Sequence, residues 1–410
     1  MRILHIVPTY LPAYNRGGPI WSVHNLNKWL VKKGVDVTVY TTNIDVKGKV
    51  REGVETIVDD VKVWYFPASY PKVWEYWRVG ILPAFLPRHW EYSRDLHKAL
   101  IQNTKNFDLV HVTSTFLFAS TLGPYYAQKH KKPYVISPRG NLMEPLELKG
   151  AFQKKMYIRA VEERMLARAS AIHFTVPQEE EQYLFHNLPL KKSIIIPNGI
   201  EPDEFGNCPA KDYFRKKYNI PEGIKIVLFL GRISWKKGLD TLIPAFAEVV
   251  GKEPNALLVI AGSDDENYKK HVQLLITNYP PAQAGQLQSK VIFTGMISGN
   301  DKIAALQESD VFVLSSYSEN FSMSAVEAMY MKLPIVLTKR VGIAPIVEKY
   351  GAGIVVEKNE KEIAEAILKI CADEKLKIAM GEAGRRLVEE KFEMSRIANQ
   401  WMAAYQNLLI

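Results

Sequence analysis

The sequence predicts an α/β fold built from two parallel-sheet domains, and three observations support this. The chain has 410 residues, which is more than one ordinary hydrophobic core holds. Short β-branched and apolar runs alternate along it with helical stretches, as expected of sheets covered by helices. A segment rich in Pro, Gly, Asn and Asp, residues 196–212, interrupts that series near the middle of the chain.

Eleven strand-like runs carry this pattern, and the interruption separates the first six from the last five. We therefore predict one domain at 1–198 and a second at 199–386. The C-terminal segment, 387–410, has helical periodicity and is expected to return to the first domain. The runs are RILHIV, DVTVYTT, LVHV, PYVIS, AIHFTV and SIIIPN, then IKIVLFLG, ALLVIAG, KVIFTG, DVFVLSS and PIVLT.

Composition argues against several classes of protein. Cys208 and Cys371 lie far apart, so we expect neither a disulfide framework nor a cysteine metal site, and a reducing, cytoplasmic compartment fits. The first residues, MRILHIVPTYLP, are typical of a strand and not of a signal peptide. No run approaches the ~20 apolar residues that a membrane span needs.

The net charge of +9 is concentrated in the first half of the chain. Residues 1–198 hold 27 Lys and Arg against 17 Asp and Glu, whereas the remainder is close to neutral. Such an asymmetry indicates that the first half meets an anionic partner, either phosphates or a membrane surface. The Trp-rich and Pro-rich stretch at 63–90 is either a loop packed on its own aromatic rings or an amphipathic surface for a membrane or a bulky acceptor.

Two glutamates stand in an otherwise small and apolar stretch, SSYSENFSMSAVEAMYMKLPIV. Glu319 follows a predicted strand, at the edge where open α/β sheets bind ligands, and Glu327 lies early in the helix that comes next. Lys332 is the only cation nearby in sequence, so we expect both carboxylates to lack a protein partner and to bind a ligand. The alternative for Glu327 is a capping box with Ser324 as the N-cap.

A second group of polar residues follows the strand IKIVLFLG. Arg232 comes directly after this strand, and Lys237 precedes a predicted amphipathic helix. If both strands belong to one sheet, these cations share an edge with Glu319. A planar guanidinium and a compact ammonium suit a diphosphate. Cations at a helix start oppose the helix dipole, which itself favours a bound anion over a pair of solvated side chains.

A third group, Gly17-Gly18-Pro19, lies between the first strand and the first helix. Glycine lets backbone N–H groups approach an anion at a helix N-terminus, although Gly-Pro before a helix is also ordinary turn chemistry. The loop lacks the G-x-G-x-x-G spacing of dinucleotide enzymes, which argues against a Rossmann dehydrogenase.

Together these stretches resemble the retaining family 4 glycosyltransferases. The resemblance rests on E-x7-E in ENFSMSAVE, G-R-x4-K-G in GRISWKKG, the early Gly-Gly loop and IPNGI at the linker, and it covers essentially the whole chain. PYVISPRGNLMEP is also similar to bacterial members that build cell-surface polysaccharides. The family resemblance implies the GT-B fold, in which two Rossmann-like domains face each other across a central cleft. It also implies a hexosyltransferase that moves a sugar from a nucleoside diphosphate sugar to an acceptor hydroxyl.

The resemblance also implies roles for particular residues. The second glutamate of the motif would bind the ribose hydroxyls, the first would contact the donor sugar, and the two cations would hold the diphosphate. The base would be read largely by backbone near 295–297. The implied donor site comprises Gly18, Arg232, Lys237, Glu319, Phe321, Ser322, Met323, Ser324 and Glu327, with Glu319, Arg232 and Lys237 as the catalytic group.

Two departures from the family pattern affect these roles. Many members have glycine where this chain has Ser322, so a side chain is expected close to the donor. Many also have a histidine where this chain has Thr113, and His111 is expected to face the core. Thr113 and Arg139, both at strand ends in the basic half, are the candidates for acceptor binding. Arg139 could instead contact the donor phosphate, and a surface turn is the alternative to both roles.

Neither a metal nor a resident cofactor is expected. The chain has no D-x-D triplet and no histidine pair at ligand spacing, and Asp264-Asp265 is typical of a polar turn. Leaving-group charge would then be met by Arg232, Lys237 and the helix dipole. The resemblance implies attack on the face from which the nucleotide departs, with a donor phosphate oxygen accepting the acceptor's proton.

The expected partners are a nucleotide sugar, with UDP favoured over GDP, and a saccharide or lipid-linked acceptor in bacterial polysaccharide or glycolipid synthesis. We expect a cytoplasmic protein that contacts the inner face of the membrane through its N-terminal domain. The alternatives are a GT-B nucleotide-sugar epimerase and a non-enzymatic protein that binds membranes or nucleic acid. Nucleic-acid binding gives no reason for the two glutamates in the neutral half, so no nucleic-acid partner is expected.

Overall fold

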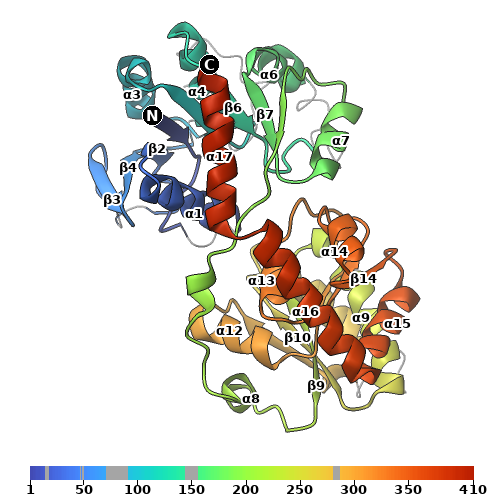
Figure 1. Ribbon diagram of the computed structural model, residues 1–410. Helices are drawn as coiled ribbons and strands as arrows, with labels where there is room; N and C mark the ends of the chain where they lie inside the picture. The colour runs from blue at the N-terminus through green and yellow to red at the C-terminus, as the bar shows by residue number, and fades with distance from the viewer. Residues whose placement is uncertain (14–17, 47, 49, 71–90, 144–155, 280–286) are drawn as a thin grey trace. The chain divides into compact units, whose positions relative to one another are not determined.

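The chain folds into two compact units, shown by the computed structural model (Figure 1). The structure describes residues 1–13, 18–46, 48, 50–70, 91–143, 156–279 and 287–410. Unit 1 comprises Met1–Gly199 and Met394–Ile410, and unit 2 comprises Ile200–Glu393. The predicted boundary at 198/199 lies one residue before this division. The returning segment begins later than the predicted residue 387, because 387–391 completes a helix of unit 2.

The described residues of unit 1 form an eight-stranded sheet with the order β3-β4-β2-β1-β5-β6-β7-β8. Its strands are parallel except β3, which pairs antiparallel with β4 at one edge. The strands are β1 (Arg2–Ile6), β2 (Asp36–Thr42), β3 (Glu55–Val58), β4 (Val61–Phe66), β5 (Leu109–Thr113), β6 (Tyr134–Ser137), β7 (Ala171–Phe174) and β8 (Ser193–Ile195). The helices are α1 (Gly18–Lys32), α3 (Arg94–Asn103), the short η3 (Thr104–Asn106), α4 (Phe118–Lys129), the π-helical turn η4 (Ile158–Glu162), α6 (Glu163–Arg168), α7 (Pro177–Phe185) and α17 (Met394–Leu409).

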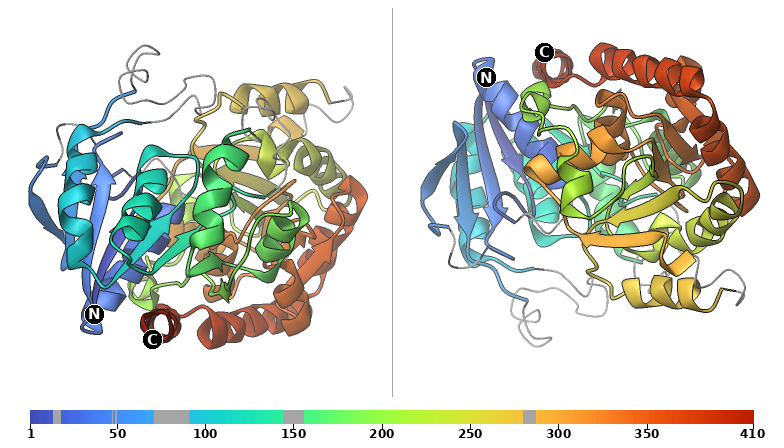
Figure 2. Two further views of the ribbon diagram at one scale, coloured as in Figure 1. Left: turned by 90° about the horizontal axis from the view of Figure 1, so that it is seen from above. Right: turned by 90° about the horizontal axis from the view of Figure 1, so that it is seen from below.

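Helices cover both faces of this sheet, and each face has its own apolar core. One core holds the inward sides of α3, α4, α6 and α7, and the other holds those of α1 and α17. Figures 1 and 2 show α17, in red, alongside α1, in blue. Trp401 and Tyr405 of α17 are fully buried there, so the end of the chain completes the core of unit 1.

The described residues of unit 2 form a six-stranded, parallel sheet with the order β11-β10-β9-β12-β13-β14. The strands are β9 (Lys225–Leu230), β10 (Ala256–Ala261), β11 (Val291–Gly295), β12 (Val311–Leu314), β13 (Ile335–Thr338) and β14 (Gly353–Val356). The helices are η5 (Pro202–Phe205), α8 (Tyr213–Lys217), η6 (Trp235–Lys237), α9 (Leu239–Lys252), α10 (Lys269–Thr277), α12 (Gly299–Glu308), α13 (Met323–Tyr330), α14 (Ala344–Tyr350), α15 (Glu360–Ala372) and α16 (Glu374–Lys391).

Each sheet has a switch point, where the chain stops adding strands on one side and continues on the other. In unit 2 the chain runs outward through β9, β10 and β11 and then returns to place β12 on the other side of β9. In unit 1 the corresponding pair is β1 and β5. Ligands of open α/β sheets bind at the carboxyl ends of strands at such points. The loops after β9 and β12 are therefore the first place to look for a site in unit 2.

All eleven predicted strands are present, and the fold class, two parallel-sheet α/β domains, is confirmed. Sequence reasoning missed β3, β4 and β14. Most of the aromatic stretch at 63–90 lies outside the described residues, as does Gly17. None of the helices in the described part of the chain has the length and apolar character needed to cross a membrane.

Candidate functional site

The switch point of unit 2 is held together by a tight turn after β9. Gly238 has φ +68°, and a Cβ at this position would lie 2.0 Å from the carbonyl oxygen of Ser315, just past β12. The Ser315 hydroxyl donates to the Gly238 carbonyl at 2.9 Å, and the Tyr317 N–H donates to the Lys236 carbonyl at 2.8 Å. Only glycine fits this approach, which brings the end of β9 against the end of β12.

Lys237 and Glu319 form an ion pair at this edge. The Lys237 ammonium donates to Glu319 Oε2, and both side chains are largely buried, with exposed fractions of 16% and 22%. Two β-bridge hydrogen bonds fix the backbone of Glu319. Its N–H donates to the Arg340 carbonyl at 3.1 Å, and its own carbonyl accepts the Gly342 N–H at 2.9 Å. The predicted meeting of the two strand ends is therefore observed, and Glu319 has a protein partner that we did not expect.

Helix α13 begins at the same edge and is capped by Ser322. Ser322 has φ +66°, and its hydroxyl accepts the Ala325 N–H at 3.3 Å. The capping box with Ser324 as N-cap is therefore wrong, because the cap lies two residues earlier and Glu327 is in the second turn. The left-handed backbone also explains why glycine suits this position, and the serine side chain faces the helix it caps.

The remaining predicted residues of this loop divide between core and helix start. Phe321 is buried, and its ring packs against that of Phe392 at 5.4 Å. Met323 opens α13 with Ser324 beside it, where first-turn N–H groups have no intrahelical acceptor. Ser316 Oγ and Asn320 Oδ1 are buried and hydrogen-bond to no other described residue. Such unsatisfied polar atoms beside Glu319 are a common sign of a ligand or water site.

Glu327 also has a partner that the sequence did not reveal. Lys302, in the first turns of α12, donates to Glu327 Oε1 at 2.9 Å, with exposed fractions of 23% and 16% for the two side chains. The expectation that both glutamates lack protein partners is therefore wrong. Burial by itself lowers the pKa of Lys302, but the charge and hydrogen bond of Glu327 outweigh it, and the pKa lies above its ordinary value.

Arg232 lies one residue beyond Gly231, and its side chain is exposed. The structure pairs Arg232 with no carboxylate among the described residues. Its guanidinium is therefore available to an anion at the edge that Lys237 and Glu319 occupy. At the end of β11, where the base was predicted to be read, Gly295 has φ +74° and Ile297 is buried.

The switch point of unit 1 contains stacked, buried imidazoles. The rings of His5 and His111 stack with their centroids 4.1 Å apart, as expected of residues in register on β1 and β5. His5 shares a hydrogen bond of 2.9 Å with Thr113, and His111 shares one of 2.7 Å with Tyr405. His111 thus faces the core as predicted. Thr113 is also buried, so its predicted contact with an acceptor is not supported by this arrangement.

Arg139 follows β6 in a left-handed conformation, with φ +56°. Its guanidinium donates to the Asn198 side chain, and its Nε is buried without a partner among the described residues. Burial lowers the pKa of Arg139 to about 10, while the charge of Glu179 raises it. Arg139 therefore lies in a turn, as the alternative has it, but the residue is only partly exposed and its Nε is buried. Gly18 opens α1 after β1, but its surroundings lie outside what the structure describes.

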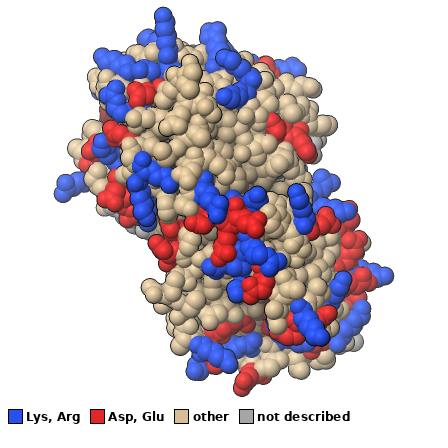
Figure 3. All heavy atoms as spheres, viewed as in Figure 1, with Lys and Arg blue, Asp and Glu red and all other residues tan. Residues whose placement is uncertain are grey.

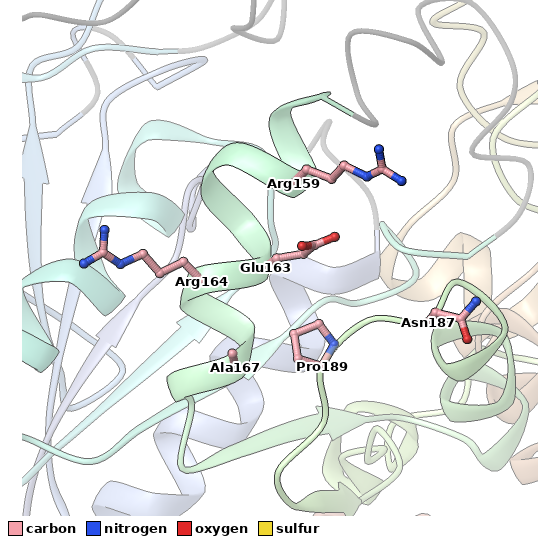
Figure 4. A pocket seen from close by; sticks show the side chains of 6 residues that line it. All are labelled: Arg159, Glu163, Arg164, Ala167, Asn187 and Pro189. Carbon is pink, nitrogen blue, oxygen red and sulfur yellow. The ribbon is translucent and has the colours of Figure 1, made fainter.

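Unit 1 has an open hollow of about 550 Å³ (Figure 4). It is lined by Arg159, Glu163 and Arg164 with Ala167, Asn187 and Pro189, and the two guanidinium groups point away from each other in the figure. Because its cations do not converge, the hollow is a poor anion site.

Metal ligands are not grouped in the described parts of the chain, where no three His, Cys, Asp or Glu side chains converge. Asp264 accepts the Lys269 N–H at 3.1 Å, and Asp265 accepts the Ser263 hydroxyl at 3.0 Å, as in a polar turn.

Comparisons with known proteins agree with this architecture. A family model described as glycosyl transferase 4-like domain matches residues 17–199, and one described as glycosyl transferases group 1 matches residues 210–387. A glycosyltransferase of Methanocaldococcus jannaschii is 30% identical over 56% of this chain and 57% of its own length. The capsular polysaccharide biosynthesis glycosyltransferase CapM of Staphylococcus aureus is 29% identical over 52% of this chain and 53% of its own. The chain thus matches a little over half the length of these two relatives.

A solved structure shows the same fold over nearly the whole chain. HepE of Anabaena, crystallised in complex with UDP and glucose, aligns with a TM-score of 0.75 at 16% identity, covering 99% of this chain and 100% of its own. One glycosyltransferase family model matches each unit, and together they span most of the chain, so the chain belongs to the glycosyltransferases.

Proposed function

We propose that the protein transfers a hexose from a nucleoside diphosphate sugar to an acceptor hydroxyl, with retention of anomeric configuration. One observation carries this proposal. At the switch point of unit 2, Lys237 pairs with Glu319, and Arg232 follows the same strand as Lys237. Helix α13 begins at this edge, and its Glu327 pairs with Lys302. The cations and the helix start suit a diphosphate, and the carboxylates suit paired sugar hydroxyls.

The roles follow from the chemistry of each group. Arg232 and Lys237 would neutralise the diphosphate as it leaves, a contribution that grows in the transition state. Glu319 would accept hydroxyls of the donor sugar, and Glu327 those of the ribose. A donor therefore replaces or shares the lysine partner of each glutamate. A donor phosphate oxygen would take the acceptor's proton, so that no protein base is required, in keeping with a buried Thr113.

UDP is the nucleotide that we favour, because the HepE structure holds UDP and glucose. The acceptor that we propose is a saccharide or lipid-linked intermediate of bacterial polysaccharide or glycolipid synthesis, because CapM acts in capsular polysaccharide biosynthesis. The family models describe glycosyl transfer, which favours this function over an epimerase or a non-enzymatic binder.

The test is a panel of UDP-, GDP- and ADP-sugars with nucleotide release as the readout, with and without EDTA. We expect one donor to release its nucleotide, at a rate that EDTA does not reduce. NMR of the product should show the same anomeric configuration as in the donor. Glu319→Gln serves as the inactive control. Release from no donor would refute the function, an inverted product would refute retention, and a loss in EDTA restored by Mg²⁺ would refute metal independence.

We also propose that unit 1 contacts an anionic membrane surface from the cytoplasmic side. The helix layer of α3, α4, α6 and α7 exposes Tyr125, Leu184 and Phe185, the last by 72%. Exposed cations lie on the same helices, α4 and α6, and in the segment that follows α7: Lys129, Arg164, Arg168, Lys191 and Lys192. Figure 3 shows Lys and Arg side chains along the upper edge of unit 1. Each such cation contributes about 1 kcal/mol near an anionic surface.

Co-sedimentation with phosphatidylglycerol vesicles at low salt tests this contact. We expect binding that falls with salt, is absent with phosphatidylcholine, and weakens in Phe185→Ser. Leu274→Ser, which changes a comparably exposed apolar side chain of unit 2, is the control. An absence of binding to the anionic vesicles at low salt rejects the proposal.

A further inference from the structure

Lys302 is the one member of the donor-site ion pairs to which neither the sequence motifs nor the resemblance assigns a role. It lies in the first turns of α12, which follows β11, and its ammonium reaches Glu327 on the neighbouring α13. The ammonium also lies 5.5 Å from the ring centroid of Phe205, and the charge of Glu204 acts on it. Lys302 is therefore held between the start of unit 2 and the glutamate of the donor site.

A similar ion pair at the opposite edge of the same sheet shows what a purely structural pair looks like. Lys377 donates to Asp310 Oδ1 at 2.9 Å, the same distance as between Lys302 and Glu327, and the exposed fractions are also similar. Asp310 Oδ2 accepts the Ile226 N–H at 2.8 Å. Both oxygens of Asp310 are therefore used to fasten β12 to β9 and α16.

Glu327 differs because only one of its oxygens is used. Oε1 accepts from Lys302, whereas Oε2 hydrogen-bonds to no residue in the described part of the chain, and it is not a buried atom. A largely buried carboxylate normally has both oxygens satisfied. The fold therefore fixes one oxygen of Glu327 and leaves the other available to a ligand.

Fixing one oxygen has two consequences for a ribose ligand. It restricts the side-chain rotamer of Glu327, so less conformational entropy is lost when the free oxygen accepts a hydroxyl. It also places a positive charge next to a carboxylate that would otherwise repel the diphosphate of the same nucleotide. Both effects strengthen the hydrogen bond to the ribose without Lys302 touching the nucleotide.

We propose that Lys302 is a positioning residue that sets how strongly the site selects ribonucleotides over 2′-deoxyribonucleotides. The proposal rests on the assignment of Glu327 to the ribose in the proposed function. A hydrogen bond to a charged group corresponds to roughly 10- to 150-fold in affinity. We therefore expect the wild-type protein to bind the ribonucleotide at least about 10-fold more tightly than its 2′-deoxy form.

The experiment measures this ratio by calorimetry. The probes are whichever of UDP, GDP and ADP the wild-type protein binds most tightly, and the 2′-deoxy form of the same nucleotide. Lys302→Met should reduce the ratio at least threefold, and Lys302→Arg should largely restore it. Lys377→Met, which breaks the matched pair at the opposite edge, should leave the ratio at the wild-type value. If Lys302→Met does not fold, Lys302→Gln, which keeps a donor and removes the charge, takes its place.

The outcomes separate this inference from the proposed function. If Glu327→Gln keeps the wild-type ratio, or no nucleotide binds, the ribose assignment itself fails. If Glu327→Gln lowers the ratio but Lys302→Met or Lys302→Gln does not, the assignment stands and the role of Lys302 is refuted. If Lys377→Met lowers the ratio as much as Lys302→Met, the effect reports general stability and the role of Lys302 is likewise refuted. In the double variant Lys302→Met/Glu327→Gln, the second change should add little, because both act through one carboxylate.

Discussion

The switch point of unit 2 holds paired, partly exposed charges, whereas that of unit 1 holds buried, uncharged imidazoles. In unit 2, Glu319 and Glu327 are both tied to lysines and remain within reach of solvent. In unit 1, burial lowers the pKa of His5 to about 3 and that of His111 well below its ordinary value, so both rings are neutral near pH 7. The same kind of sheet edge therefore serves two chemistries. One holds paired charges, which suit a charged ligand, and the other is a neutral hydrogen-bonded support.

The neutral support continues beyond the two stacked rings. Ser137 shares hydrogen bonds with His111 at 2.7 Å and with His173 at 2.8 Å, and His173 shares one of 2.8 Å with the Ile196 carbonyl. These side-chain contacts link the four adjacent strands β1, β5, β6 and β7 to the segment that leads out of unit 1. Protonating any of these rings would place a charge in the core, so we expect the two units to respond differently to acid.

The largest expected effect is the loss of unit 1 stability in acid. In the unfolded chain histidines take up protons near pH 6.5, but buried His5 does so only near pH 3. The unfolded state therefore binds more protons, and stability falls as pH drops from about 6.5 to 3. His5 alone accounts for about 5 kcal/mol by pH 3, and His111 and His173 act in the same direction.

Hydrogen exchange followed by mass spectrometry, from pH 7.5 to 4.5, separates the two units. Peptides of unit 1 should lose protection first, once exchange is corrected for its intrinsic pH dependence. His173→Gln should flatten that response, and His271→Gln, which changes an exposed histidine of unit 2, should not. Equal loss in both units would break the contrast.

The next largest effect is on turnover, from the cations of unit 2. Removing one donor that stabilises a developing anion costs about 10²–10³ in kcat, or about 3–4 kcal/mol. Arg232→Ala and Lys237→Ala should each lower kcat to this extent and change KM less, because the leaving-group charge grows in the transition state. Steady-state kinetics with the released nucleotide decides. A raised KM with unchanged kcat would show uniform binding and remove both cations from the catalytic group.

The fold was largely predictable, because its signals are local. β-branched runs such as residues 256–261 become buried parallel strands, and Lys237 meets Glu319 because both follow strands of one sheet. The edge strand β3 was missed, since residues 55–58 alternate exposed and half-buried positions and carry a weak apolar signal. Its neighbour β4 was missed because it overlaps the aromatic stretch that we interpreted as a loop or an amphipathic surface. The sequence did contain a signal for the burial of His5 and His111, because each lies inside an apolar strand-like run. Their stacking follows from the pairing of these two strands in the sheet.

Other features of the site depend on packing that no local pattern encodes. Lys302 and Glu327 are 25 residues apart, and their contact requires the fold to bring the Lys302 side chain of α12 within reach of α13. Ser322 as N-cap requires a left-handed backbone, which sequence rules assign to glycine before serine. Neither composition nor residue spacing predicts that Glu319 and Glu327 each form an ion pair with a lysine. Charged residues that look unpartnered in a sequence thus need a three-dimensional check before a ligand is inferred.

A third effect comes from Glu162, a buried carboxyl of unit 1 with a raised pKa. Burial raises the pKa of Glu162 to about 7, although its carboxylate accepts the Phe116 N–H at 2.9 Å. The folded state therefore holds a proton that the unfolded chain loses near pH 4.5, and stability falls as pH rises from about 4.5 to 7. The sign is opposite to that of the histidines, and the size is about 3 kcal/mol.

Glu162→Gln isolates this contribution. The variant should match the wild type near pH 4.5 and be more stable at pH 8, since glutamine can also accept the Phe116 N–H without a buried charge. Thermal unfolding of the wild type and variant at several pH values provides the difference. Glu163→Gln, the adjacent and less buried position, is the control. A constant difference between wild type and Glu162→Gln across this range would show that Glu162 does not titrate there.

The smallest effect, and the one that most sharpens the picture of unit 2, separates its two glutamates. Glu327 should contact the ribose, which the reaction does not change, so Glu327→Gln should weaken free nucleotide and nucleotide sugar alike by about 1.5–3 kcal/mol. Glu319 should contact the sugar, which gains positive character as its bond breaks, so Glu319→Gln should lower turnover. It also releases Lys237 from its ion pair, so binding of free nucleotide should stay the same or tighten. Calorimetry with nucleotide and with donor, on both variants, measures these differences. If both variants bind nucleotide like the wild type, Glu327 only pairs with Lys302. The charges at this edge would then serve the fold, as the Lys377–Asp310 pair does at the other.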